Sequence, residues 1–485
     1  MNRRHFLKSA ALGGGLLGLG CSNLFSRKQP NILFILADDQ AFDTINALGY
    51  TDVQTPNLDR LVQNGITFTH AYNMGAWHGA VCVASRTMLN TGRFLWEAHE
   101  LEPELQTEQS EGRFWSQQMK AAGYDTYMSG KWHVKDINPE DIFDQVRDVR
   151  PGMPKDFFDW ENPEEHHLGY DRPVQGEPDE WSPYDTSLGG FWEGGTHWSE
   201  VLGNHGLVFL DQAQKSENPF FMYLAFNAPH DPRQSPIEFV DKYPLDSMDV
   251  PENFQPLYPH KDAIGCGPDL RDERLAPFPR TEYAAKVHRQ EYYAIITHMD
   301  AQIGRILDAL ESSGQADNTY IFFTADHGLA CGHHGFMGKQ NMYDHSVRVP
   351  LFVVGPGIPK DQKISTPVYL QDIMPSILQL AGIETPEYVD FKSLLPLISG
   401  KRKSNYDLIY GGYIDLQRMI TDGDYKLIYY PKIDKTILYN LKDDPLEKND
   451  LSDQPEYQEK IQEFQQKLRQ KQQELNDPLL TGESI

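Results

Sequence analysis

Side chains that can bind a cation, transfer a proton or attack an electrophile occur in short groups along this sequence. Two adjacent carboxylates, Asp38 and Asp39, follow a long apolar run, and the pair Asp326-His327 follows another. Adjacent anions repel each other unless a cation lies between them, and carboxylate oxygens suit the hard divalent ions calcium and magnesium. Taken alone, the Asp pair also fits a strand-to-helix cap, and Asp326-His327 also fits a solvated loop.

A cysteine and an arginine lie one helical turn apart in the string Cys82-Val83-Ala84-Ser85-Arg86, which is followed by Thr91-Gly92-Arg93. The spacing predicts a helix that begins near Cys82 and that Gly92 ends. The positive end of the helix dipole and the Arg86 charge would then surround the sulfur, which suits an activated thiol or a bound anion. A lone cysteine of this kind is also often purely structural.

Lysines and histidines that could bind an anion or move a proton complete the set. Lys131 and His133 lie in Gly130-Lys131-Trp132-His133, His230 follows Ala228-Pro229, and Lys339 follows Gly338. Histidine is suited to general acid and base roles near neutral pH. Considered singly, each of these residues also fits an ordinary turn or a surface loop.

Strand-like apolar runs end immediately before these polar groups. The runs are 31–37, 124–128, 219–226 and 320–324. Helical patterns alternate with them; Ile303, Ile306, Leu307 and Leu310 share one helix face, and Gly314 is placed to end that helix. The alternation predicts an α/β layered fold. Ligands of open α/β sheets bind beyond the carboxyl ends of the strands, so the four endings predict one shared site.

Composition indicates a folded protein that repels other anions. The chain has 485 residues, 39% hydrophobic, with 44 Lys and Arg against 70 Asp and Glu, a formal net charge of −26. That charge argues against nucleic acid as a partner, so an anionic substrate needs a local cationic pocket. The segment 136–205, rich in Trp, Gly, Pro and acidic residues, is expected to form long loops near a binding site.

The N-terminal residues have the pattern of an export signal. A basic start with Arg3-Arg4 precedes a short apolar run and Cys21. Residues 1–20 are therefore predicted to be a signal peptide with a twin-arginine-like start, and Cys21 is a candidate lipidation site that would anchor the protein to a membrane. This predicts an exported protein of the periplasm or cell envelope. Cys266 and Cys331 either pair or remain free, and two buried free thiols are the favoured interpretation.

The chain is expected to divide into a catalytic domain, 30–399, and a C-terminal α+β subdomain, 400–485. In the subdomain, 419–421 and 425–430 have hairpin character around Asp422-Gly423-Asp424, and Ile437-Leu438-Tyr439 adds a strand. Tyr457, Ile461, Phe464 and Leu468 then mark one face of an amphipathic helix.

Taken together, these motifs resemble the type I, formylglycine-dependent sulfatases of the alkaline phosphatase superfamily. The string from Cys82 to Arg86, with Thr91-Gly92 nine residues after the cysteine, is similar to the family signature, and Ala84 stands where proline is commoner. The other motifs follow in the family's order, from about residue 30 to about residue 451. Histidine after Asp326, where many relatives have asparagine, is closer to the iduronate-2-sulfatase-like branch.

The resemblance implies a fold, a cofactor and residue roles. The fold would be a large central mixed, mostly parallel β-sheet flanked by helices, with a smaller C-terminal antiparallel sheet. Cys82 would be oxidised to formylglycine by a formylglycine-generating or anaerobic sulfatase-maturing enzyme. The implied calcium ligands are Asp38, Asp39, Asp326, His327 and the modified Cys82. The implied catalytic residues are Cys82, Arg86, Lys131, His133, His230 and Lys339.

The expected activity is hydrolysis of a sulfate ester on a saccharide or polysaccharide, with ulvan, carrageenan and glycosaminoglycans as candidates. Trp77, His78 and His99 are candidate sugar-binding residues, because aromatic faces and hydrogen-bonding groups suit carbohydrate. Two alternatives stay open. One is a phosphonate monoester hydrolase or phosphodiesterase that uses the same nucleophile, and the other is a non-catalytic glycan-binding surface protein.

Overall fold

A sheet of eight strands forms the centre of the structure, a computed structural model that describes residues 29–158, 161 and 167–482. Within this sheet only β12 runs opposite to the others, so the predicted mixed, mostly parallel sheet is confirmed. In spatial order the strands are β13 (Gln362–Ile364), β2 (Ile66–Phe68), β12 (Leu351–Val354), β10 (Thr319–Ala325), β1 (Asn31–Asp38), β9 (Phe220–Pro229), β5 (Asp125–Lys131) and β6 (Gln145–Arg150).

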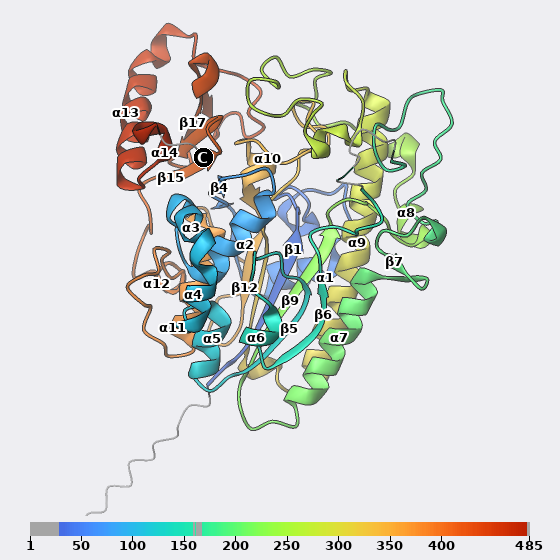
Figure 1. Cartoon of the computed structure of the whole chain (residues 1–485), viewed down its shortest axis with the longest axis vertical. Helices are drawn as coiled ribbons and strands as arrows, with labels where there is room; N and C mark the ends of the chain where they lie inside the picture. The colour runs from blue at the N-terminus through green and yellow to red at the C-terminus, as the bar shows by residue number, and fades with distance from the viewer. Residues whose placement is uncertain (1–28, 159–160, 162–166, 483–485) are drawn as a thin grey trace, which may run out of the picture.

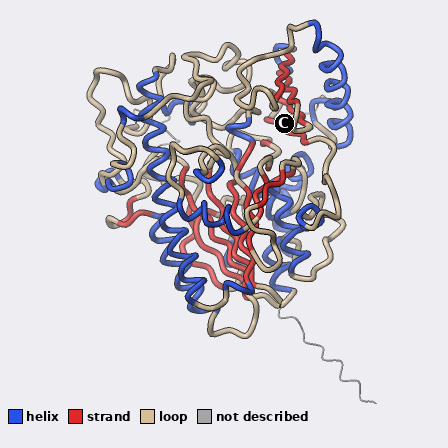
Figure 2. Tube along the Cα trace, turned by 180° about the vertical axis from the view of Figure 1, so that it is seen from behind, coloured by secondary structure: helices blue, strands red, loops and turns tan. Residues whose placement is uncertain are grey.

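The middle of the sheet is apolar on both faces because helices cover both faces (Figures 1 and 2). All residues of β1 and β9 are buried, as expected for central parallel strands. Helices α1, α7 and α9 pack together on one side, and α2, α5 and α11 pack together on the other. Strand β1 lies between β9 and β10 and is parallel to both, so the ends of these three strands meet at one edge.

Fourteen α-helices occur among the described residues. The longest, α9, buries the predicted face Ile303, Ile306, Leu307 and Leu310, and the chain turns at Gly314 with φ +71°. The helices are α1 (Pro56–Asn64), α2 (Val81–Thr91), α3 (Leu95–Leu101), α4 (Leu105–Ser110), α5 (Trp115–Ala121), α6 (Pro139–Ile142), α7 (Trp198–Ala213), α8 (Ile237–Val240), α9 (Glu282–Ser312), α10 (Asp344–Val347), α11 (Ile373–Leu380), α12 (Leu395–Ile398), α13 (Gln458–Glu474) and α14 (Pro478–Thr481).

The C-terminal part adds a second, five-stranded sheet (Figure 1). Its strands, in spatial order, are β18 (Lys435–Asn440), β17 (Tyr425–Tyr430), β16 (Gln417–Thr421), β15 (Ile409–Tyr413) and β4 (Gly75–Ala76). The predicted hairpin and the amphipathic helix α13 are both present, and Ile461, Phe464 and Leu468 are buried. Strand β4 comes from the segment before Cys82, so this sheet is joined directly to the region of the cysteine.

Two smaller sheets complete the strands. One contains β11 (Arg348–Val349), β3 (Ala71–Tyr72) and β14 (Val368–Tyr369), and the other contains β7 (Trp192–Glu193) and β8 (Thr196–His197). The expectation of loops over 136–205 is wrong for 145–150, which form the edge strand β6, and for the start of α7 at Trp198; the short elements α6, β7 and β8 also lie in this segment. Strand β6 is largely exposed and polar, so it lacks the apolar pattern that marks a strand in sequence.

The predicted signal 1–20 and the candidate lipidation site Cys21 lie outside the described residues and stay predictions. Within the part that the structure describes, no helix has the length and apolar character needed to span a bilayer. Cys266 and Cys331 are buried free thiols, which confirms the favoured interpretation.

Candidate active site

Strand ends position most of the polar groups that the sequence singled out. Strand β1 delivers Asp38 and Asp39, and β5 ends at Lys131. Strand β10 ends one residue before Asp326, and β9 ends one residue before His230. Because these four strands are parallel neighbours, their carboxyl ends lie at the same edge of the sheet.

Three of the carboxylates converge on the Cys82 thiol. One oxygen each from Asp38, Asp39 and Asp326 lies with the Cys82 sulfur in a buried group whose ligand atoms are all within 4.8 Å of one another. The thiol lies 3.3 Å from Asp38 Oδ1 and 3.6 Å from Asp39 Oδ1. The backbone N–H of Asp39 donates to Asp326 Oδ1 at 3.2 Å, which links the ends of β1 and β10.

Three buried cations contact these carboxylates. Lys131 Nζ donates to Asp38 Oδ2, and Lys339 Nζ donates to Asp39 Oδ1 at 2.7 Å. Arg86 Nε donates to Asp326 Oδ2 at 2.7 Å, and Arg86 Nη2 lies 3.6 Å from Asp38 Oδ1. We call these six residues the strand-end cluster; its members are Asp38, Asp39, Asp326, Arg86, Lys131 and Lys339.

Burial and neighbouring charges shift the pKa values of the three carboxylates. Burial raises the pKa of Asp38 to about 6 and that of Asp39 to about 8, even though Lys131 and Lys339 oppose the shift. Burial also penalises ionised Asp326, but Arg86, Lys131 and Lys339 together hold the pKa of that carboxyl well below its usual range. Burial therefore disfavours the ionised forms of Asp38 and Asp39 despite the three side-chain cations, and a divalent cation would offset that cost.

The donor set fits a calcium ion. Calcium takes carboxylate oxygens at about 2.3–2.6 Å, so ligand atoms on opposite sides of it are about 5 Å apart, close to the spread observed here. His327 Nδ1 lies 3.2 Å from the Gly328 carbonyl oxygen, while its buried Nε2 has no hydrogen-bond partner among the described residues. Burial lowers the pKa of His327 to about 4, which leaves the ring neutral. Its free nitrogen suits a cation, although His327 is not one of the four residues of the compact group.

Cys82 lies in the first turn of α2, as predicted, and Gly92 ends the helix with φ +77°. Of the two options predicted for this position, an activated thiol and a bound anion, the surroundings do not favour the activated thiol. Burial, with Asp326 and Asp38 adding to it, raises the pKa of Cys82 well above its usual value despite Lys131 and Lys339. Lys339 Nζ lies 3.1 Å from the sulfur. The surroundings therefore suit an oxygen nucleophile next to a cation better than a free thiolate.

Two histidines flank the cluster. His230 Nε2 lies 3.7 Å from Asp39 Oδ2, and its Nδ1 lies 2.6 Å from the backbone carbonyl oxygen of Asp231. His133, with φ +56°, lies at the turn after β5, and its buried Nδ1 has no partner among the described residues. Burial, aided by Lys131, lowers the pKa of His133 well below its usual value, which leaves a neutral ring that can accept a proton.

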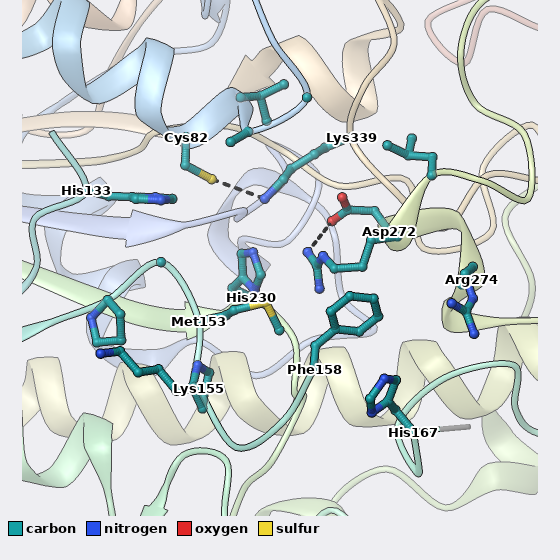
Figure 3. Close-up of a pocket in the computed structure, with 18 of the residues that line it drawn as sticks. Cys82, His133, Met153, Lys155, Phe158, His167, His230, Asp272, Arg274 and Lys339 are labelled. Atoms are coloured by element: carbon teal, nitrogen blue, oxygen red, sulfur yellow. Dashed lines mark hydrogen bonds and ion pairs between the residues drawn. The ribbon is translucent and has the colours of Figure 1, made fainter. Parts of the chain in front are cut away.

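A cavity of about 1480 Å³ opens above the cluster. Cys82, His133, His230 and Lys339 line its inner end, as Figure 3 shows. The outer wall comes from two stretches of chain. One belongs to the segment 136–205, which the sequence predicted to lie near a binding site, and the other, around residue 271, was not predicted. The wall residues include Met153, Lys155, Phe158, His167, Arg271, Asp272 and Arg274. A space of this volume is large enough for a sugar and a neighbouring group.

The candidate sugar-binding residues form a separate aromatic group. Trp77 stacks on His99 at 5.7 Å between ring centroids, and His78 meets Trp77 edge-on. Trp77 is only 3% exposed, and His78 lies 3.6 Å from Glu102. None of the three is among the described residues that line the cavity. Their role in sugar binding stays a prediction.

Several residues of the site were missed. Asp231, which contacts His230, is its direct neighbour in the chain, and this adjacency was the only available signal. Arg271 and Asp272 come from a short 3₁₀ helix, Arg271–Leu275, with no motif to mark it. Lys155 lies in a loop whose composition alone suggested a binding site.

Comparison with known proteins identifies the family. The family model described as Sulfatase matches residues 30–383, and the model described as N-sulphoglucosamine sulphohydrolase, C-terminal, matches residues 332–474. The N-acetylglucosamine-6-O-sulfatase of Bacteroides thetaiotaomicron is 26% identical over 517 aligned positions, which cover 90% of this chain and 85% of the relative.

Solved structures share the fold. One, described as a complex with its substrate D-glucosamine-2-N,6-O-disulfate, has a TM-score of 0.70 and 24% identity and covers 93% of this chain and 99% of that one. The phosphonate monoester hydrolase of Agrobacterium radiobacter has a TM-score of 0.68 and 21% identity over 93% of this chain and 97% of that one. The first family model covers well over half of the chain. The chain therefore belongs to the sulfatase family and is a hydrolase of that family.

Proposed function

We propose that this sulfatase removes sulfate from a sulfated saccharide or polysaccharide, with calcium at the strand-end cluster and a formylglycine made from Cys82 as its nucleophile. The observation that carries the proposal is the convergence of Asp38, Asp39 and Asp326 on the Cys82 sulfur at the inner end of one large cavity. Lys339 contacts both the sulfur and one of the carboxylates, which joins the nucleophile position to the cation position.

Asp38, Asp39 and Asp326 would hold the calcium ion, and the free nitrogen of His327 supports a role for that residue as a further ligand. When bound, calcium supplies positive charge that polarises the nucleophile and the sulfate oxygens, and the hydrated aldehyde supplies the attacking hydroxyl. Arg86 keeps two of the carboxylates in place from a fully buried position. With the ion present, Lys131 and Lys339 are available to neutralise the sulfate oxygens as negative charge develops.

Proton transfer is assigned to the residues at the edge of the cluster. His230, or Lys339 beside it, would protonate the leaving alcohol oxygen. His133 would accept the proton from the second hydroxyl when sulfate leaves. Both histidines line the cavity; His230 directly follows strand β9, and His133 lies two residues after the end of β5. General acid and base groups of this kind each contribute about 10²- to 10⁴-fold.

The finer identity of the enzyme is also part of the proposal. The pair Asp326-His327 supports the iduronate-2-sulfatase-like branch. The relative described as an N-acetylglucosamine-6-O-sulfatase supports a sulfated carbohydrate as substrate. The N-terminal sequence supports export to the periplasm or cell envelope, with Cys21 as a lipid anchor and a maturing enzyme as the partner that converts Cys82.

The experiment that tests the proposal uses full-length protein from a host that converts such cysteines. Peptide mass spectrometry across residues 74–93 is expected to show the mass decrease that replaces the Cys82 thiol by an aldehyde. Sulfate release from a panel of sulfated saccharides then identifies the substrate. Removing calcium with a chelator is expected to lower sulfate release by at least about 10-fold and to lower the melting temperature, and adding calcium should restore both. A converted, calcium-loaded protein that releases no sulfate from any ester would contradict the proposal.

A second candidate activity is hydrolysis of phosphonate monoesters or phosphodiesters. The observation that favours it is the shared fold with the Agrobacterium radiobacter enzyme across almost the whole chain. Phosphorus and sulfur esters both place negative charge on oxygens that the same cations can neutralise. Comparing kcat/KM for an aryl sulfate, an aryl phosphonate monoester and an aryl phosphodiester separates the two. We expect the sulfate ester to be preferred; a strong preference for phosphorus would reverse the assignment.

A further inference from the structure

His230 is held from the side opposite to the reacting groups by its neighbour Asp231. The Nδ1 atom of the ring lies 2.6 Å from the Asp231 carbonyl oxygen and 3.2 Å from Asp231 Oδ1. Both atoms are acceptors, so Nδ1 carries the hydrogen. The other ring nitrogen, Nε2, faces Asp39 at 3.7 Å. The contacts with Asp231 therefore determine which nitrogen of His230 points toward the reaction.

Asp231 is itself fixed by two further side chains. Tyr170 Oη donates to Asp231 Oδ2 at 2.8 Å, and Arg271 Nη1 donates to the same oxygen. Arg271 Nη2 also donates to Asp272 Oδ1 at 2.8 Å, at the wall of the cavity. Asp231 is 3% exposed and Tyr170 is fully buried. A buried carboxylate with this many donors is held in one orientation.

We propose that Asp231, held by Tyr170 and Arg271, is a positioning residue that orients His230 to protonate the leaving oxygen of the sulfate ester. This inference rests on the proposed function and deepens it, because it selects His230 over Lys339 as the proton donor. His230 enters this step as the imidazolium, with a hydrogen on each ring nitrogen. When the S–O bond breaks, its electron pair stays on the leaving oxygen, that oxygen takes the proton from His230 Nε2, and the ring becomes neutral. His230 keeps the hydrogen on Nδ1, which continues to point toward Asp231.

The alternative donor, Lys339, has a different set of contacts. Its Nζ lies within hydrogen-bond distance of Asp39 and of Cys82, where it can stabilise the nucleophile and the cation site. Among the described residues Asp231 contacts His230, Tyr170 and Arg271 but not Lys339, so a change at Asp231 should affect proton donation by His230 more directly than donation by Lys339. A carboxylate that orients an imidazole through Nδ1 is a recurring arrangement in enzymes that move protons with histidine.

The dependence of rate on the leaving group distinguishes positioning from simple structural support. Sugar alcohols are poor leaving groups and need a proton, whereas nitrophenolate leaves without one. Asp231→Asn keeps the shape and the backbone acceptor but removes the charge. We expect kcat for a sulfated saccharide to fall by about 10- to 100-fold and kcat for 4-nitrophenyl sulfate to fall by less than about 3-fold. Equal losses on both substrates would overturn the proposal.

A double-mutant cycle gives an independent test. In a His230→Ala background, Asp231→Asn should have no further effect on the saccharide rate, because the two residues act as one unit. Additive losses would show that Asp231 acts elsewhere, which contradicts the proposal. Tyr170→Phe removes one hydrogen bond to Asp231 and is expected to give the same leaving-group pattern with a smaller loss, about 3- to 10-fold on the saccharide. This variant serves if Asp231→Asn does not fold.

Asp179→Asn is the matched control. Asp179 accepts a hydrogen bond from Arg172 Nε at 2.8 Å in the same region, but it does not contact His230. Its replacement should leave both substrates unaffected. The outcomes also separate the two levels of inference: a wild-type protein that releases no sulfate contradicts the proposed function, whereas active wild type with an unchanged leaving-group pattern in Asp231→Asn contradicts only the role of Asp231.

Discussion

Two of the buried groups of charged residues in the described part of this protein are built from similar parts. The strand-end cluster has three carboxylates and three cations. The second group, which we call the C-terminal cluster, has two carboxylates and two cations. In it Lys426 Nζ donates to Asp344 Oδ1 and Glu447 Oε1 at 2.5 and 2.7 Å, and Arg348 lies 3.2 Å from Asp344 Oδ2. Both groups are neutral when all members are charged, so charge balance does not distinguish them.

The difference lies in what remains unsatisfied. Glu447 Oε2 accepts the Asp344 backbone N–H at 2.7 Å, and every charged group of the C-terminal cluster has a partner within it. In the strand-end cluster, Arg86 Nη2 has no hydrogen bond among the described residues. That cluster also opens to the cavity through Cys82 and Lys339. A divalent cation added there gives a net charge of +2, which attracts a sulfate ester.

The largest expected effect removes the nucleophile position. Cys82→Ala should lower kcat/KM for any sulfate ester by at least about 10⁴-fold, because the group that attacks sulfur is lost. The melting temperature should change little, since alanine keeps the helix α2 intact. Sulfate release and thermal unfolding, measured on the same preparation, check both statements. Retained activity in this variant would mean that the strand-end cluster works without Cys82.

In the C-terminal cluster we expect a substitution to lower stability and to leave activity unchanged. Lys426→Met leaves Asp344 and Glu447 buried without their shared cation, and breaking a buried ion pair costs about 3–5 kcal/mol of unfolding free energy. The kcat of the folded fraction should stay within about twofold of wild type, because the cluster does not contact the cavity lining. Chemical denaturation and activity at low temperature are the measurements. A large loss of kcat with unchanged stability would remove the distinction between the two clusters.

Glu447 gives the C-terminal cluster a pH dependence. Burial raises the pKa of Glu447 from 4.5 to about 7, although Lys426 opposes the shift. Because the folded state then binds this proton more tightly than the unfolded state, the contribution of Glu447 to stability is greatest at low pH and is lost as pH rises from about 5 to about 8. Glu447→Gln should remove about 1–3 kcal/mol of that loss. Denaturant titrations of both proteins at pH 5 and pH 8 test this; parallel profiles would contradict it.

The smallest effect is expected at the outer wall of the cavity. Lys155 is exposed and forms no ion pair with any residue that the structure describes. Lys155→Ala should raise KM about 2- to 5-fold for a saccharide with a second anionic group and leave an aryl sulfate unchanged, since exposed charges interact weakly. Added salt should shrink the difference. A fall in kcat instead would place Lys155 in the chemistry.

Much of the inner site was predictable because each of its groups follows a strong local pattern. Asp38-Asp39 comes after an unbroken apolar run, and Cys82 and Arg86 lie in one short string. What could not be predicted depends on contacts between distant segments. Arg271 reaches Asp231 across 40 positions of sequence, and neither residue lies in a regular pattern. The edge strand β6 is polar and exposed, so it lacked the apolar signal that identified β1 and β9.

The surroundings of the Cys82 thiol also depend on contacts between distant segments, which local sequence does not predict. The position of Cys82 in the first turn of a helix was predicted correctly, and from that position an activated sulfur or a bound anion was expected. The sign of its pKa shift depends on burial and on Asp326 and Asp38, which approach from two other strands. Local sequence indicates the helix, but the electrostatic surroundings are set by tertiary structure.

The burial of Cys82 determines whether oxidation of this residue comes before or after folding. The cysteine is 2% exposed, and ten of the eleven residues of α2 are buried. A separate enzyme that oxidises this side chain must bind the surrounding peptide. In the folded protein that peptide is a helix packed into the core. Under the proposed function, maturation therefore has to come before folding. A chain that folds before it is oxidised keeps the Cys82 thiol. The yield of active enzyme therefore depends on the rate of Cys82 oxidation relative to the rate of folding.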